Sequence, residues 1–205
     1  MPSTSAAALY VWSLFSALCI LGASATLFPH VCLRSARLPE ELDPSRISIL
    51  FGVRVVHGHH SRCGEFQGHE FLVNGKTFCA GCIGLLLGAS TALILSTLHF
   101  VLGFTYPWAA FIGLGCVVLG LIHIPLLRTG VPLLRTAFNA ALVASFALVL
   151  VGVDEIGSLE LDLIVIGLCV FWMFTRIQLS SWDHERICRG CGYRCVEKKI
   201  DGAIS

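Results

Sequence analysis

Cysteine and histidine residues gather in two short segments of this 205-residue chain, at spacings typical of metal ligands. Each segment contains a Cys-x-Gly-Cys pair, Cys79 with Cys82 in the first and Cys188 with Cys191 in the second. Such a pair sets two thiolates on one tight turn, so that both can reach a tetrahedral ion at about 2.3 Å. Glycine helps the backbone to fold around the ion because it has no Cβ. The predicted metal ligands are Cys63, Cys79, Cys82, Cys188, Cys191 and Cys195, with His59, His60 and His184 as supplementary ligands.

These ligands can bind metal in two arrangements, and the spacing does not decide between them. Each segment can bind its own ion, or Cys79 and Cys82 can share one ion with Cys188 and Cys191 and so staple the tail to the preceding loop. Neither the loop nor the tail is long enough to form a hydrophobic core of its own, and small protein segments of this kind are often stabilised by a bound metal. Sulfur-rich tetrahedral sets select zinc or an iron–sulfur cluster, and the mixture with histidine favours structural zinc.

Other chemistry is open to the same cysteines. Cys82 begins a predicted helix, whose dipole stabilises a thiolate, so the pairs could exchange thiols and disulfides. A disulfide framework would require the inverted membrane topology, because cytoplasmic thiols stay reduced. The last alternative is packing alone, which is our interpretation of the other four cysteines, Cys19, Cys32, Cys116 and Cys169.

Short strands are predicted around the first cysteine pair. Residues 69–73 and 76–78 flank an Asn-Gly dipeptide at 74–75, which is a strong signal for a two-residue hairpin. The hairpin would deliver the cysteine pair to the start of the next helix. The apolar run 47–56 is too short to span a membrane and is interpreted as a strand or an interfacial segment, and 193–197 is also strand-like. We therefore predict a small zinc-ribbon-like β module.

The rest of the chain is too apolar for a water-soluble domain. It is 56% hydrophobic and 13% charged, with a mean hydropathy of +0.81, whereas soluble domains carry about 25% charged residues. A net charge of +1 gives no basic face for nucleic acid. Five stretches approach the roughly 20 apolar residues that cross a bilayer, namely 7–28, 80–104, 106–127, 134–153 and 161–177. The predicted fold class is all-α membrane, with about five transmembrane helices.

The basic residues orient these spans. All 14 Lys and Arg residues lie in three regions that five spans place on one side, and basic loops stay in the cytoplasm. We expect a multi-pass plasma-membrane protein with its amino terminus outside, its carboxyl terminus and both cysteine segments in the cytoplasm, and Asp154, Glu155 and Glu160 facing outward. Ala23-Ser24-Ala25 resembles a signal-peptide cleavage site, but no basic residue precedes it.

The predicted organisation has four parts, with few polar groups inside the spans. The parts are a first transmembrane helix (1–30), a cytoplasmic Cys/His loop with a hairpin (31–79), helices two to five (80–180) and a cysteine-rich tail (181–205). His99 is expected near the outer end of its span, and His123 and Asn139 near the inner face. No span carries a charge near mid-bilayer, which argues against a proton pump or a dedicated ion path.

Residues 63–90 resemble an uncharacterised prokaryotic family of small polytopic membrane proteins. That family shows Cys-His, then Ser-Phe, a glycine turn, and Cys-Ala-Arg-Cys-Thr-Gly entering a membrane helix. The chain departs from it at Gly64, where the family has His, and at Gly81, where it has Arg. The resemblance implies a membrane location and a metal, with no established activity. The positions that carry it are Cys63, His69-Glu-Phe, Gly75, Phe78-Cys79-Ala-Gly-Cys82, Gly84 and Gly88.

The expected function is structural or regulatory. The sequence contains no phosphate loop, nucleophile elbow or His-Glu-x-x-His motif, so no catalytic residue is predicted. We expect a metal-binding module that acts as a scaffold, docking or sensing subunit, with the lipid bilayer and other membrane subunits as partners and no nucleic acid. The alternatives are a membrane thiol–disulfide oxidoreductase that uses the cysteine pairs, and a metal-ion transporter.

Overall fold

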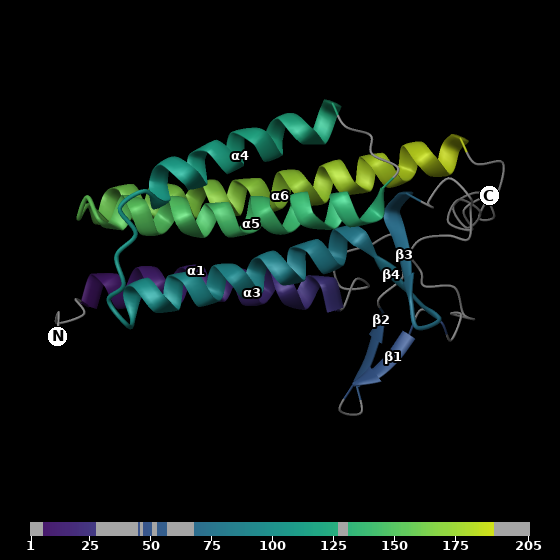
Figure 1. Cartoon of the computed structure of the whole chain (residues 1–205), viewed down its shortest axis with the longest axis horizontal. Helices are drawn as coiled ribbons and strands as arrows, with labels where there is room; N and C mark the ends of the chain where they lie inside the picture. Colours follow the sequence, from purple (N-terminus) through teal and green to yellow (C-terminus); the bar gives the residue numbers. More distant parts are fainter. Residues whose placement is uncertain are drawn as a thin grey trace, which may run out of the picture.

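The protein folds as a bundle of long helices with two small β-hairpins at one end, as a computed structural model shows (Figure 1). The helices are α1 (Ala6–Leu27), α3 (Ala80–Phe100), α4 (Ala109–Leu126), α5 (Pro132–Asp154) and α6 (Leu159–Gly190). The structure describes residues 6–27, 45, 47–50, 53–56, 68–126 and 131–190.

Four of the described helices are long and apolar enough to cross a membrane, which supports the predicted membrane class. They are α1, α3, α5 and residues Leu159–Trp182 of α6, while the apolar stretch Ala109–Ile122 of α4 is shorter. The bundle also leaves large apolar side chains exposed on its outside, among them Phe111, Phe171 and Phe174. A water-soluble protein would bury such side chains, whereas lipid tails solvate them.

Two helix ends differ from the sequence prediction. Helix α3 ends at Phe100 rather than 104, because the chain turns at Gly103, whose φ of +75° no helix can contain. Helix α6 continues to Gly190, so residues 181–190 are helical and do not belong to a ribbon. Arg186 lies over the Trp182 ring at 5.4 Å, four residues along the helix, and this pairing favours the extension.

The predicted strands at 69–73 and 76–78 are confirmed as an antiparallel hairpin, and the run 47–56 forms a second hairpin rather than one strand, while the strand-like segment 193–197 lies outside the described residues. β1 (Ile47–Leu50) pairs with β2 (Val53–Val56), and β3 (Glu70–Val73) pairs with β4 (Lys76–Cys79). Asn74 and Gly75 both have positive φ, as a two-residue hairpin turn of type I′ requires. The Lys76 ammonium donates a hydrogen bond of 2.7 Å to the Ser48 hydroxyl and so links the two hairpins.

Helix α5 packs closely against α3 because glycine lines the contact. A Cβ on Gly84 would lie 2.6 Å from the Thr136 carbonyl oxygen, and one on Gly88 would lie 2.7 Å from that of Ala140. Only a missing side chain lets the two backbones approach so closely. The buried core between the helices includes Val11, Phe15, Ala92, Leu150 and Val151.

The chain direction alternates from α3 to α6, so the same helices meet at two opposite ends (Figure 1). We call the start of α3, with β3 and β4, the cysteine end. We call the opposite end, where α3 and α5 stop and α6 begins, the histidine end. Helix α3 has 21 residues, which separates the two ends by about 30 Å.

Candidate functional site

Cys79 and Cys82 lie together where β4 runs into α3. Cys79 is the last residue of β4 and the N-cap of α3, in an extended conformation, and Cys82 follows as the third helical residue. An N-cap side chain normally reaches back over this third position, so both thiols belong to the first turn. Cys79 is buried and Cys82 half-buried. The turn also presents the positive end of the helix dipole, which favours thiolates.

Arg176 of α6 brings a positive charge to the same turn. Its Nη2 donates a hydrogen bond of 3.3 Å to the Gly81 carbonyl oxygen, and both this Nη2 and Cys79 Sγ lie 3.8 Å from the place that a Cβ on Gly81 would take. Its Nη1 is buried without a hydrogen-bond partner. In the described part of the chain, no carboxylate is paired with this guanidinium. A buried cation is costly unless an anion compensates it, so the pairing favours the thiolate form of the cysteines.

Helix α5 fixes the position of this turn. The Thr136 hydroxyl lies 3.1 Å from the Ala80 carbonyl oxygen and donates a hydrogen bond to it. Arg135 Nη1 donates to His69 Nδ1 over 2.6 Å. Because arginine is always protonated, Nδ1 of His69 is the acceptor and the ring carries its proton on Nε2. The first turn of α3 is therefore held by α5, α6 and the hairpin.

The structure brings together two of the predicted ligands, Cys79 and Cys82. For Cys188 and His184 it describes only their helical backbone. The other predicted ligands, Cys63, Cys191, Cys195, His59 and His60, lie outside the described residues. Within residues 6–27, 45, 47–50, 53–56, 68–126 and 131–190, no group of three or more Cys, His, Asp or Glu side chains is arranged to hold a metal ion.

The length of α6 bears on the two ways of closing the metal site. Arg176 meets Gly81, so this level of α6 lies beside the first turn of α3. Position 188 is twelve residues further along a continuous helix, about 18 Å away at 1.5 Å per residue. Ligands of one zinc ion have sulfurs about 2.3 Å from the metal. The helix therefore does not bring Cys188 to the level of Cys82.

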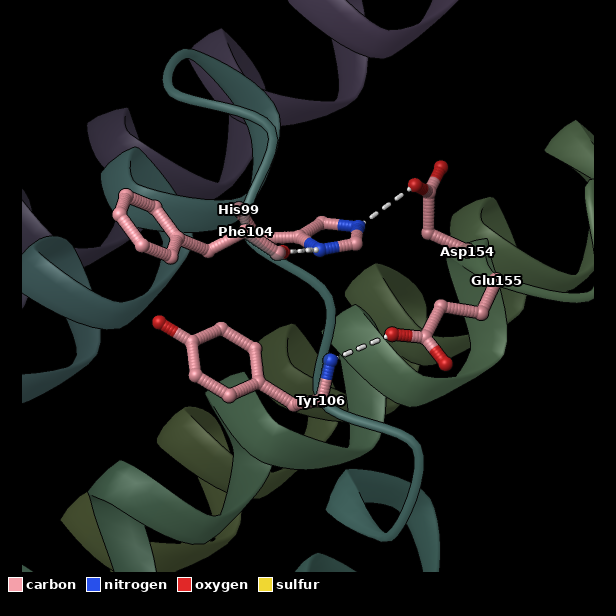
Figure 2. Close-up of polar contacts among 5 residues, drawn as sticks. All are labelled: His99, Phe104, Tyr106, Asp154 and Glu155. Carbon is pink, nitrogen blue, oxygen red and sulfur yellow. Dashed lines mark hydrogen bonds and ion pairs between the residues drawn. The ribbon is translucent and has the colours of Figure 1, made fainter.

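The histidine end contains a second cluster of polar side chains, which the sequence analysis did not place together. The His99 ring lies between the Phe104 carbonyl oxygen, 2.7 Å from Nδ1, and Asp154 Oδ2, 2.8 Å from Nε2 (Figure 2). Next to it, the backbone N–H of Tyr106 donates to Glu155 Oε1 over 2.7 Å (Figure 2). The sequence analysis predicted His99 near one end of its span and Asp154 in the loop on the same side of the membrane. Because the helix directions alternate, these two positions lie at the same end of the bundle. This alternation is the sequence signal from which a contact between His99 and Asp154 could have been predicted.

Comparisons with protein-family models, with curated proteins and with solved structures find no significant match to this chain. The resemblance of residues 63–90 to a membrane-protein family therefore stays a prediction.

Proposed function

We propose that the protein is a membrane scaffold, docking or sensing subunit whose cysteine end is tied by a structural zinc ion. The observation that supports the proposal is the placement of two thiols on the first turn of α3, beside a buried arginine that has no carboxylate partner among the described residues. Thiolates are the form of cysteine that binds metal. Zinc would lock the hairpin of β3 and β4 to the helices that hold this turn.

Charge favours a site in which each segment binds its own ion. Zinc with three thiolates and one neutral histidine carries one negative charge, and Arg176 would offset it. The ligands would be Cys79, Cys82 and Cys63, with His59 or His60. The distance along α6 also favours separate ions, because it separates Cys188 from the first turn of α3. An ion held only by protein ligands has no open coordination position, which suits a structural role.

The proposed orientation places the cysteine end in the cytoplasm, at the plasma membrane. Arg135, Arg176 and Arg186 of the described helices all belong to this end, and 77–127 contains no Lys or Arg. Basic residues remain on the cytoplasmic side. An impermeant amine reagent applied to sealed right-side-out cells should therefore leave Lys76 unlabelled until the membrane is opened. Labelling of Lys76 in intact cells would overturn this orientation.

Elemental analysis of the purified full-length protein tests the metal proposal. The wild type should carry tightly bound zinc, and Cys79→Ser and Cys82→Ser should each lose about one zinc ion per chain, because each removes one thiolate and the three remaining ligands hold a structural zinc ion much less tightly. Cys116→Ser on α4 is the matched control and should keep the wild-type metal content. Cys188→Ser should also keep the ion bound by Cys79 if each segment binds its own. Metal-free wild type with fully reactive thiols would contradict the proposal.

A second candidate function is thiol–disulfide exchange, because Arg176 and the helix dipole favour thiolates even without metal. The Cys82 thiolate, the more exposed of the two, would attack a protein disulfide and release one substrate thiolate, leaving a mixed disulfide. Cys79, after losing its proton, would attack the Cys82 sulfur and release the second substrate thiolate. The Cys79–Cys82 pair is oxidised and the substrate disulfide is reduced.

The two functions are separated by trapping. In the exchange mechanism, Cys79→Ser should accumulate a mixed disulfide with its substrate, and Cys82→Ser should not. In the structural mechanism, neither variant should trap a partner and both should lose zinc. A trapped partner on metal-free protein would replace the first proposal by the second.

A further inference from the structure

A buried aspartate joins the pair of His99 and Asp154 at the histidine end. Asp162 lies near the start of α6 and is only 3% exposed. Its carboxyl group lies within electrostatic reach of Asp154 and His99, and its Oδ1 is buried without a hydrogen-bond partner. Three helices thus each bring one titratable side chain to the same place.

Hydrogen bonding fixes one proton on the His99 ring. A carbonyl oxygen can only accept, so the 2.7 Å contact with Phe104 requires that Nδ1 carry a proton. The 2.8 Å contact between Nε2 and Asp154 Oδ2 then requires a further proton. Without it, two lone pairs would face each other. The proton lies either on the ring or on the carboxyl, and in both cases the pair is neutral as a whole.

Asp162 requires another proton. Its side chain is 3% exposed and its Oδ1 has no hydrogen-bond partner, and a buried carboxyl without a compensating cation favours the neutral, protonated form. The surroundings offer no other compensation. Among the described groups, α3 contributes His99 and α5 contributes Asp154, with Glu155 turned to the Tyr106 N–H. None of the Lys and Arg residues that the structure describes lies at this end, since the sequence has none within 6–27, 77–126 or 136–175.

We propose that His99, Asp154 and Asp162 form a proton-binding latch at the histidine end. With one proton between His99 and Asp154 and one on Asp162, the three side chains, which come from α3, α5 and α6, are neutral together. Loss of the proton of Asp162 leaves a buried carboxylate beside that of Asp154, and their repulsion loosens this end. Asp154 is the entry for the proton, because its side chain is 25% exposed while Asp162 is buried. The ligand is a proton rather than a metal, since the described side chains form no metal site.

The sign of the pH dependence follows from this exchange. Opening exposes Asp162 to water, where a carboxyl ionises readily, so opening releases a proton. Raising the pH therefore favours the open form. The opening equilibrium constant should rise by up to about tenfold per pH unit, because one proton is released for each opening event.

Infrared difference spectroscopy of the full-length protein during a pH titration tests the latch. The wild type should show the carbonyl band of a protonated buried carboxyl, lost as the pH rises. Asp162→Asn should lack the band because its amide imitates the neutral acid without titrating. Glu160→Gln is the matched control, since Glu160 is exposed on the same turn, and it should keep the band.

Thermal unfolding across the same pH range supplies the second measurement. The wild type and Glu160→Gln should lose stability with rising pH, and Asp162→Asn should lose much of that dependence. If Asp162→Asn does not accumulate in cells, Asp162→Glu, which keeps a titrating carboxyl at this position, is measured in its place. A wild type without a titrating carboxyl band, or Asp162→Asn with the wild-type pH dependence, would overturn the proposal. Metal content plays no part in either measurement, so the latch and the zinc proposal fail independently.

Discussion

The two ends of α3 face opposite electrostatic problems. At the cysteine end, a buried guanidinium lies beside two thiols with no carboxylate partner among the described residues. At the histidine end, two carboxyls lie beside one imidazole, with no Lys or Arg nearby among the described residues. The first end can be neutralised by thiolates, which bind metal, and the second by protons. Under the two proposals, the available compensating charge decides what kind of ligand a buried polar group can take.

Removing Arg176 should have the largest effect, and it acts on the cysteine end alone. If the neighbouring thiols are ionised, Arg176→Met leaves buried negative charge without its partner, which costs about 3–5 kcal/mol in such pairs. Thermal unfolding in detergent measures the loss. Arg186→Met, at an exposed position, should be close to the wild type. Equal stability of the two variants would show that the thiols are neutral.

Removing His99 tests the other end. His99→Leu takes away both ring contacts and leaves the Phe104 carbonyl oxygen and Asp154 unpaired. We expect a loss of about 2–3 kcal/mol in unfolding free energy, since hydrogen bonds to charged groups contribute about 1.5–3 kcal/mol. His99→Leu should also keep its zinc, and a loss of metal would break the separation of the two ends.

Glycine packing between the ends should matter less. In Gly84→Ala the new methyl would lie 2.6 Å from the Thr136 carbonyl oxygen, so α3 and α5 must move apart. Overpacking of this kind costs about 1–3 kcal/mol. Gly115→Ala on α4 meets no atom within 4 Å and is the control. Equal unfolding temperatures for these two variants would argue against the close approach of α3 and α5.

The smallest effect is expected at Glu155. Its carboxylate accepts a hydrogen bond from the Tyr106 backbone N–H in an exposed setting, where water can replace it. Glu155→Ala should lower the unfolding free energy by about 1 kcal/mol or less. Its pH dependence should match the wild type because Glu155 is not part of the latch. A flattened pH profile would extend the latch to this residue.

Local signals in the sequence were enough to predict several parts of the fold. Asn74-Gly75 predicted the hairpin because both residues tolerate the positive φ that the turn needs. Apolar runs predicted the membrane helices, but α3 stops earlier and α6 continues further than hydropathy indicated. Hydropathy measures lipid compatibility, whereas a helix ends where backbone conformation requires it, as at Gly103.

The candidate sites were less accessible to prediction because they depend on contacts between distant residues. The Cys79–Cys82 pair is visible as a motif, and its place at the start of a helix followed from the hairpin. Arg176 could not be assigned to it, since the contact joins residues far apart in the chain. The sequence identifies His99 only as a single polar residue near the end of a span, and the packing of α3, α5 and α6 is what brings it to Asp154 and Asp162.

Hydrogen exchange of the full-length protein, measured by mass spectrometry under two perturbations, tests the central comparison most directly. A zinc chelator at constant pH should increase exchange in 69–82 and leave 99–106 and 154–162 unchanged. A rise in pH should increase exchange in 99–106 and 154–162 and leave 69–82 unchanged, once the data are corrected for the pH dependence of the intrinsic exchange rates. If either perturbation loosens both ends equally, or neither end responds to its own, the assignment of metal to one end and protons to the other is wrong.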